Sequence, residues 1–482
     1  MIRMTPAPAL LAVLLGGCSM APHYVRGALP VPASWPSGDA YLKQSEATLP
    51  SVSYHDVFLD PRLQKIVEQA LVNNRDLRVA AANIVSARAL YRIQRADLLP
   101  EITGTADATF SRSSTATSTS TSTLGSGTRQ NYSASIGASA FEIDLFGRIR
   151  SLTTAQLNTY FATEAGARAT RLTLVGDIAT AWLTYASDKS LLAIAVQTTV
   201  SAGESVKLTK ARLDGGIAPR TDLRQAELVL SQAQSDEAEQ KTALAQDVNA
   251  LQLLVGAPVD VGLLPDSIEQ AVPTLAELPH GLNSQILLRR PDVVQAEYQL
   301  RAANAQIGAA RAALFPTISL TGLAGLASSA LSSLFTGGAF NWSVAPSVNY
   351  SIFHAGAARA AVTESVADRD AALATYEKAI QTAFRETADA LARRGTIDAQ
   401  QTAQVNLTTE AMDNYKLSDA RYRGGIDTFL NSLDAQRSLY TAQKSLIATR
   451  LVRATNLVTL YRVLGGDSTL DAAPTGPVAA AS

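Results

Sequence analysis

The sequence predicts a mixed α/β membrane protein in which two halves repeat one arrangement of elements. Three observations predict this fold class. Matching segments recur in the same order in both halves, several segments alternate apolar and small polar residues, and two very long stretches contain no proline. Strict alternation is typical of transmembrane β-strands, and the long stretches favour α-helical coiled coils.

The duplication is visible as pairs of matching residues. The first half contains RLDGGI at 212–217 and the second contains RYRGGI at 421–426. The spacing between halves changes at one place only, a loop beginning near Ser111 that is longer in the first half. Three further matches are Pro100 with Pro316, Gly215 with Gly424, and Gly256 with Gly465. Matches in one order along the chain indicate an internal repeat.

Each half is expected to contain a helix, a β-hairpin, a very long helix and a last helix. The opening helices are expected at Pro61–Leu99 and Ser284–Phe315, because proline follows each of them. The first repeat is expected at 61–256, with its hairpin at 101–146 and long helices at 147–256. The second is expected at 284–465, with its hairpin at 316–353 and long helices at 356–465. A linker at 257–283 and a disordered tail at 466–482 complete this division.

The expected strands are apolar on one face and small and polar on the other. Tyr132, Ala134 and Ile136 alternate with serine and glycine, and Phe340, Trp342 and Val344 alternate with asparagine, serine and alanine. A half-exposed soluble sheet gives the same alternation. The barrel is favoured because these segments have the length of about ten residues that a tilted transmembrane strand needs.

Four strands cannot close a barrel, and open sheet edges in lipid leave backbone groups unpaired. Several chains are therefore expected to share one barrel, with eight strands from two chains or twelve from three. The proline-free stretches, Gly147–Ala218 and Gly356–Leu464, carry apolar residues at steps of three and four. Within each, a helix of about 65 residues would be about 100 Å long. Trp182 and Tyr376 on these stripes are expected to pack in helix interfaces.

The N-terminus has the layout of an export signal. Arg3 precedes a short apolar run, Ala9–Leu15, and Gly16 and Gly17 lead to Cys18, the only cysteine. Leu15–Cys18 resembles a bacterial lipobox. We therefore expect a lipoprotein signal peptide at 1–17 and an extended segment at 18–60 that begins with lipidated Cys18. Acyl chains such as palmitate on this residue would hold the protein to a membrane.

The composition excludes several classes of function. Charged residues make up 17% of the chain and the net charge is −1, so there is no basic surface for nucleic acid. The four histidines have no metal-ligand spacing, and no nucleotide-binding or hydrolase motif is present. Carboxylates on the helices are expected on solvated faces. We expect no enzyme activity, no metal, and no cofactor other than the covalent lipid on Cys18.

Taken together, several motifs resemble the TolC-like outer-membrane efflux proteins, and most closely their OprM-type lipoprotein outlets. These motifs are YRIQRADLLP, FEIDLFGR, LLRRPDV, GAARAALFPTISL, RYRGGID and LDAQRSLYTAQ. The resemblance covers essentially the whole mature chain. It implies a homotrimer with a twelve-stranded barrel in the outer membrane of a Gram-negative bacterium and a helical tunnel in the periplasm. It also implies a passive, gated exit duct for drugs, served by a periplasmic adaptor and an inner-membrane transporter of the resistance–nodulation–division type.

The same resemblance assigns roles at the two Gly-Gly turns, which end the long helices. Leu430, Asp434 and Arg437 match residues that close the periplasmic aperture, while Tyr422 and Asp222 match members of an inter-helix network. Arg220, Asp427 and Arg423 are candidate contacts for the adaptor. From the residues alone, Asp222 or Thr428 is expected to cap the helix that restarts after each turn.

Two other functions are compatible with parts of this pattern. An outlet for type I protein secretion would have the same duct. A lipid-anchored periplasmic coiled-coil scaffold with a soluble sheet would have the same rods but no conductance. The period-two strands argue against the scaffold.

Overall fold

The computed structural model describes residues 20–32, 34, 53–112, 128–276 and 284–466. The signal peptide expected at 1–17, the lipidated Cys18 and the tail from 467 onwards lie outside these residues. About half of the extended segment at 18–60 and part of the linker at 257–283 also lie outside. The described chain divides into two compact units, each formed by segments that are distant in sequence.

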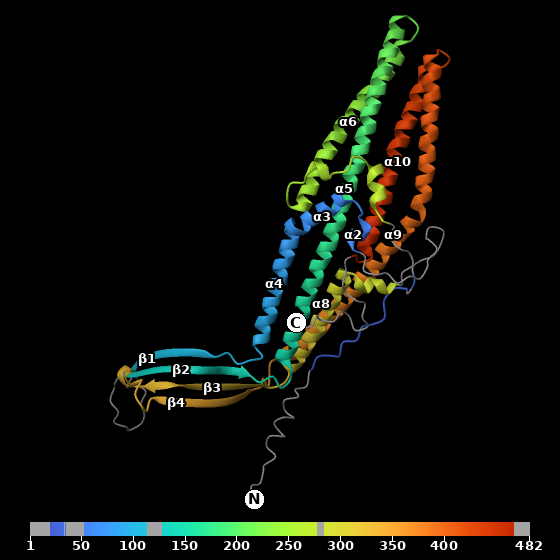
Figure 1. The fold of residues 1–482 in the computed structure, drawn as a ribbon. Coiled ribbons are helices and arrows are strands. Elements are labelled where there is room, and N and C mark those ends of the chain that lie inside the picture. The colour runs from blue at the N-terminus through green and yellow to red at the C-terminus, as the bar shows by residue number, and fades with distance from the viewer. Residues whose placement is uncertain (1–19, 33, 35–52, 113–127, 277–283, 467–482) are drawn as a thin grey trace. The chain divides into compact units, whose positions relative to one another are not determined.

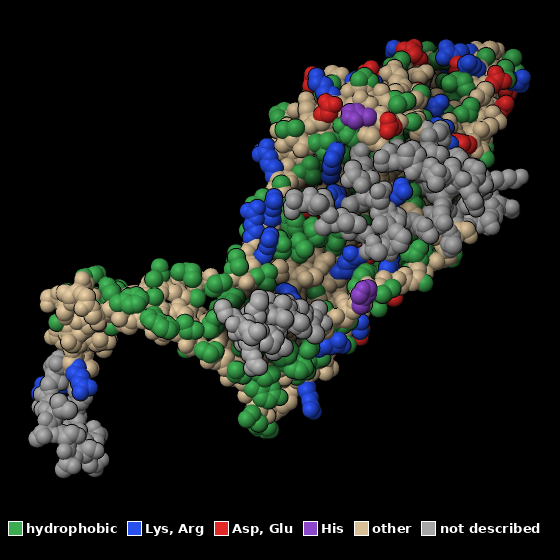
Figure 2. Space-filling model, turned by 60° about the horizontal axis from the view of Figure 1, so that its bottom comes forward, with side chains coloured by type: hydrophobic (Ala, Val, Ile, Leu, Met, Phe, Trp, Pro, Cys, Tyr) green, Lys and Arg blue, Asp and Glu red, His purple; other side chains and the backbone are tan. Residues whose placement is uncertain are grey.

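The first unit contains a four-stranded antiparallel sheet. Its strands lie side by side in chain order (Figure 1): β1 (Thr103–Arg112), β2 (Thr128–Glu142), β3 (Thr317–Ser328) and β4 (Phe340–Asn349). The two hairpins from the two halves are thus joined through β2 and β3. Strands β1 and β4 each have one edge without a neighbour in this sheet. Hydrophobic side chains lie along the strands in Figure 2, and several are largely exposed, including Phe110, Phe340 and Trp342.

Aromatic and ionic contacts join the strands of this unit to its helices. The rings of Phe146 and Phe315 stack with centroids 4.7 Å apart. Arg148, the first residue of the helix that follows β2, pairs with Glu142 at 2.6 Å. The hydrogen bonds that Arg148 donates to Glu142 raise the pKa of Arg148, although burial opposes the shift. These contacts fix the direction in which the chain leaves the sheet.

The opening helix of each half differs from the single helix expected from sequence. The first is two helices, α3 (Pro61–Asn73) and α4 (Arg75–Ala96), and the second is a 3-10 turn, η4 (Ser284–Arg289), followed by α8 (Pro291–Ala312). Asn74 interrupts the first because its backbone is extended and its side chain accepts a hydrogen bond from the N–H of Leu77. The side chain also donates to the carbonyl of Leu254 at 2.7 Å, which stabilises the break.

The long helices are continuous, as the missing prolines predict. They are α5 (Arg148–Asp214) and α9 (Ala357–Arg423), each of 67 residues, and they are followed by α6 (Arg220–Val255) and α10 (Phe429–Val463). Among the described residues, no helix combines the length and the apolar content needed to cross a membrane. Five shorter elements complete the fold: α2 (Tyr54–Val57), η2 (Val261–Leu263), α7 (Ile268–Ala271), η3 (Val272–Thr274) and η5 (Leu331–Ser333).

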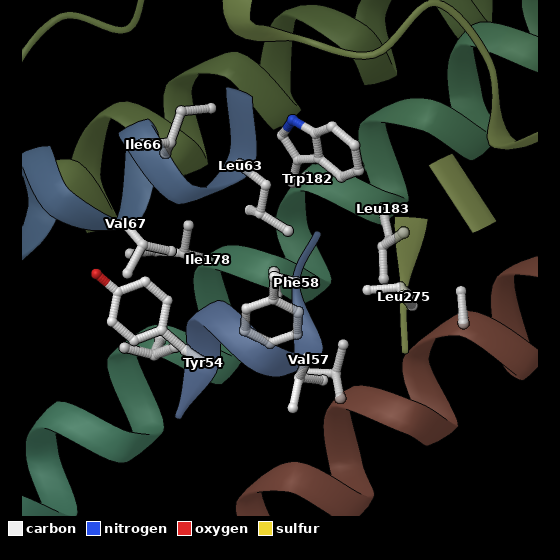
Figure 3. Packing of buried hydrophobic residues seen from close by; sticks show 14 of the residues in the cluster. Tyr54, Val57, Phe58, Leu63, Ile66, Val67, Ile178, Trp182, Leu183 and Leu275 are labelled. Carbon is white, nitrogen blue, oxygen red and sulfur yellow. The ribbon is translucent and has the colours of Figure 1, made fainter. Parts of the chain in front are cut away.

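The second unit is held together by a hydrophobic core, part of which is shown in Figure 3. Trp182 from α5 is fully buried there beside Leu63 and Phe58, and its indole N–H donates to the carbonyl of Leu263 at 3.1 Å. The ring of Phe58 packs edge-on against Tyr461 of α10. In this core, α5 and α10 therefore pack together with residues from the N-terminal part of the chain, such as Phe58 and Leu63. Trp182 and Tyr376 are both buried and serve in packing.

Candidate gate at the helical tips

The two Gly-Gly turns have the same backbone conformation. In each, the second glycine has φ of +74°, in the left-handed region (Gly216 and Gly425). The N–H of the following isoleucine donates to a carbonyl in the last turn of the long helix at 2.9 Å in both turns. This is the arrangement that satisfies the free carbonyls at a helix end. The two turns together with the helix starts that follow them, Arg212–Leu228 and Arg421–Arg437, are called the first and second tip below.

The expectation that Asp222 or Thr428 caps the restarting helix is wrong. The residue at the cap of α6 is Pro219, which has no side-chain donor or acceptor, and Asp222 lies in the first turn instead. Thr428 does occupy the cap position of α10, but its side chain makes no capping hydrogen bond. The backbone at both caps is nearly identical, so the turn geometry suffices without a side-chain cap.

Tyr422 joins the two tips. Its ring is buried beneath the guanidinium of Arg212, whose Cζ lies 4.4 Å from the ring centroid. Arg212 also donates to the carbonyls of Tyr422 and Arg423 at 3.0 and 3.1 Å. The Tyr422 hydroxyl lies 3.4 Å from Thr209 Oγ1. Within one chain, the polar side chains that contact Tyr422 are therefore Thr209 and Arg212 among the described residues, rather than Asp222.

A small apolar cluster lies under the second tip. It consists of Tyr422, Phe429, Leu433 and Ala226, of which the last comes from α6. The rings of Tyr422 and Phe429 are 5.3 Å apart. The cluster anchors the beginning of α10 against the first repeat.

Two ion pairs lie at the second tip. Figure 2 shows acidic and basic side chains mixed over the helical part of the molecule. Arg421 pairs with Asp427 at 2.6 Å, and Arg423 pairs with Asp419 at 2.6 Å. The hydrogen bond from Arg421 lowers the pKa of Asp427. Arg220 in the first tip is exposed and has no polar side-chain partner among the described residues. Thus the candidate adaptor contacts Asp427 and Arg423 are already paired within the chain, whereas Arg220 is not.

The residues assigned to aperture closure form a separate stripe on α10. Leu430, Asp434 and Arg437 are spaced by four and three residues, so they share one face of the helix, and all three are exposed. The side chains of Asp434 and Arg437 have no hydrogen-bond or ion-pair partner within the described part of the chain. Leu430 is 57% exposed directly beside the buried Phe429. We call these three residues the gate stripe.

Sequence reasoning missed a polar contact farther from the tip. The hydroxyl of Tyr440 in α10 donates to Asp236 of α6 at 2.5 Å, and the expectation that helical carboxylates lie on solvated faces is wrong for Asp236. A usable signal was present, because Asp236 continues the helical face of Ala226 and Ala233, which are also buried.

The described residues contain no group of three or more side chains that could hold a metal ion. The polar groups at the tips instead bind one another or face outward.

Comparison with known proteins identifies the class of protein. A family model described as "Outer membrane efflux protein" matches residues 66–257 and 282–466. The probable efflux pump outer membrane protein TtgC of Pseudomonas putida is 43% identical over 460 residues, covering 95% of this chain and 94% of TtgC. The outer membrane protein OprJ of Pseudomonas aeruginosa is 40% identical over 461 residues, with 95% and 94% coverage.

A solved structure agrees with these relatives. The crystal structure of a membrane protein from P. aeruginosa is similar with a TM-score of 0.86 at 39% identity, covering 93% of this chain and all of that one. The family and these relatives are channel proteins rather than enzymes or coiled-coil scaffolds. The chain belongs to the outer membrane efflux protein family, and it is a passive exit duct of the Gram-negative outer membrane.

Proposed function

We propose that three copies of this chain assemble into one gated duct, which the second tips close at its periplasmic end. The open edges of β1 and β4 support the assembly, because unpaired backbone groups in lipid cost several kcal/mol each. Three sheets of four strands would give a barrel of twelve strands, and the long helices would continue it as a tunnel in the periplasm.

The single observation that carries the gate is the gate stripe. Leu430, Asp434 and Arg437 are exposed on a helix whose neighbouring face is anchored at Phe429 and Leu433. A threefold axis would convert each residue into a ring. A ring of Leu430 would exclude water, and a ring of Asp434 would repel itself unless Arg437 of the same or a neighbouring copy compensates the charge.

The duct is proposed to work with two other proteins. A periplasmic adaptor would contact the tips, where Arg220, Asp427 and Arg423 offer charges and Ile217 and Ile426 offer exposed apolar side chains. An inner-membrane transporter of the resistance–nodulation–division type would supply drugs and other small toxic compounds. The relative TtgC is named for an efflux pump, which favours this role over type I protein secretion.

Lipidation of Cys18 is proposed as an additional anchor. The segment that follows it is bound to α8: Asn304 donates to the carbonyl of Pro22 at 2.7 Å, and the hydroxyl of Tyr24 donates to Glu297 at 3.2 Å. A side chain at position 308, where Gly308 stands, would collide with the backbone of Ala21. This tight seat would hold the modified residue near the helical end of the first unit. Mass spectrometry of the mature N-terminus would detect the acyl groups, and an unmodified N-terminal peptide would refute this part.

The gate is tested by single-channel conductance in planar bilayers. Leu430→Ala and Asp434→Ala are expected to raise the conductance, because each removes one ring of the closure. Gln225→Ala is the matched control, since Gln225 occupies the position in the first repeat that Asp434 occupies in the second. Conductance equal to that of the wild type in both gate variants would contradict the proposal.

The pump assignment needs a cellular test. In a strain that lacks its own outlets, this protein is supplied together with candidate adaptors and transporters, and drug sensitivity is measured. Resistance is expected with at least one such set and not with the protein alone. Secretion of a protein substrate without drug resistance would favour the type I alternative.

A further inference from the structure

Helix α10 has two stripes of interest near its beginning, and only one of them is the gate stripe. The other runs along the face that packs against the first repeat and contains Phe429, Leu433, Gln436 and Tyr440. Tyr440 lies six residues beyond Asp434, which is about 9 Å along the helix axis. The contacts of Tyr440 and Gln436 therefore act close to the gate stripe, on a neighbouring face of the helix about 100° away around its axis.

Asp236 is the centre of these contacts. Its carboxylate accepts hydrogen bonds from the hydroxyl of Tyr440 at 2.5 Å and from the side-chain amide of Gln232 at 2.7 Å. The ammonium of Lys444 stands 3.8 Å away and lies over the ring of Tyr440. One turn nearer the tip, Gln436 donates to Ser201 of α5 at 3.1 Å. Two helices of the first repeat are thus bonded to α10 through side chains.

The carboxylate of Asp236 is ionised in this setting. Burial alone would raise its pKa, but the hydrogen bonds from Tyr440 and Gln232 and the charge of Lys444 together hold the pKa below its ordinary value. Hydrogen bonds to an ionised acceptor are shorter and stronger than those between neutral groups. Loss of the Tyr440 hydroxyl would therefore leave a buried charge with one donor fewer.

The bond occurs once, although the helices that carry it are repeated. The position equivalent to Tyr440 in the first repeat is Ser231, and the position equivalent to Asp236 in the second repeat is Ser445. Both of these serines are exposed. The duplicated fold therefore does not require this bond. The bond is formed only where Asp236 of α6 meets Tyr440 of α10, the helix that carries the gate stripe.

We propose that Asp236 and Tyr440 form a latch that holds α10 against α6 and thereby positions the gate stripe in the closed duct. This inference rests on the proposed gate. A cavity of about 310 Å³ adjoins the latch and gives Tyr440 room to move when the bond breaks. Its walls come from α5, α6 and α10 and include Thr198, Gln232, Gln436, Arg437 and Tyr440. Arg437 of the gate stripe lines the same cavity as Tyr440. A displacement of Tyr440 would therefore change the surroundings of a gate residue.

The experiment measures conductance and tip separation on the same full-length variants. Tyr440→Phe removes only the hydroxyl, Asp236→Ala removes the acceptor, and Asp236→Asn keeps an acceptor without the charge. Ser231→Ala and Ser445→Ala are controls at the equivalent positions. Tip separation is followed by electron spin resonance with spin labels on Ile217→Cys and Ile426→Cys, using labelled chains diluted with unlabelled ones.

Tyr440→Phe and Asp236→Ala are expected to raise the open fraction about tenfold and to broaden the distribution of tip distances, because a bond to a charged group is lost. Asp236→Asn should show a smaller change than Asp236→Ala, and the serine variants should resemble the wild type. A latch that merely aids folding would lower the yield of assembled protein without changing either readout.

Parallel measurements on Leu430→Ala and Asp434→Ala separate the two proposals. If those variants open and Tyr440→Phe keeps wild-type conductance and tip distances, the latch is refuted while the gate stands. If those variants stay closed but Tyr440→Phe widens the tip distances, the gate stripe is wrong and the latch holds the tips for another purpose, which overturns the inference as stated.

Discussion

The first and second tips have one backbone and two different sets of side chains. Gly216 and Gly425 have the same φ, and the hydrogen bonds that close the turns agree to within 0.1 Å. Beyond the glycines, the first tip restarts with exposed Arg220, whereas the second restarts with buried Phe429. The difference teaches that the duplicated turn is a shared connector, and that each copy takes its function from the residues at the start of the next helix.

Phe429→Ala should produce the largest difference between the tips. Removing this buried ring from its contact with Tyr422 is expected to cost about 3–5 kcal/mol of local stability. The equivalent substitution Arg220→Ala is expected to change local stability by less than about 0.5 kcal/mol, because its side chain is exposed. Hydrogen exchange at the two tips measures both, and equal protection in the two variants would contradict the asymmetry.

Asp247→Asn tests the comparison of the two repeats at a second place in α6, farther from the tip. Asp247 faces Asp188 in the first repeat, where the second repeat has Asn456 and Ile397. Burial, and then the charge of Asp188, raises the pKa of Asp247 to about 6. The folded state therefore binds the proton more tightly than the unfolded state, and stability falls as pH rises from about 4 to about 6.

The substitution removes this loss and makes the first repeat resemble the second. Asp247→Asn is expected to raise the Tm at pH 7.5, with a much smaller change at pH 4.5. Thermal unfolding followed by circular dichroism at the two pH values is the measurement. A Tm increase of the same size at both values would show that the carboxyl pair is not the cause.

Arg212→Ala should loosen the contact between the tips. The guanidinium lies over Tyr422 and donates to two carbonyls, so its loss is expected to cost about 1–2 kcal/mol. Arg421, the equivalent arginine of the second repeat, forms only an exposed pair with Asp427, and Arg421→Ala should have a smaller effect. Spin-label distances between Ile217→Cys and Ile426→Cys report the contact, and a larger change in the Arg421 variant would reverse the ranking.

The glycine variants should show the smallest difference between the two tips, and they therefore provide an internal control. Gly216→Ala and Gly425→Ala both place a side chain in the left-handed region, and an added Cβ meets no atom within 4 Å in either case. Each substitution should cost about 1–2 kcal/mol of backbone strain, with the same value at both tips. Unequal losses of protection in hydrogen exchange would show that the two backbones are not equivalent in solution.

Much of the fold was predictable from local patterns. The continuous helices α5 and α9 followed from the lack of proline, and the strands followed from alternation such as that of Phe340, Trp342 and Val344. The break at Asn74 was missed because asparagine is tolerated within helices, and the break depends on a bond to Leu254 from far along the chain. A pattern within one segment does not contain that partner.

The site was predictable in part. The resemblance assigned Tyr422 to an inter-helix network, and the structure places Tyr422 against the first repeat, but the resemblance did not indicate that Arg212 covers its ring within the same chain. The expectation that helical carboxylates face solvent fails at Asp236, which shares a buried helical face with Ala226 and Ala233. Its partner Tyr440 comes from the other repeat, and such a pairing depends on how the repeats pack.

The central claim is that the second tip closes the duct and the first supports it, and an exchange of tips tests it most directly. In one chimera the sequence of residues 220–228 replaces 429–437, and in the other the sequence of 429–437 replaces 220–228. Single-channel conductance in planar bilayers should rise in the first chimera and remain at the wild-type value in the second. Equal conductance in the two chimeras, or opening of the second alone, would contradict the account.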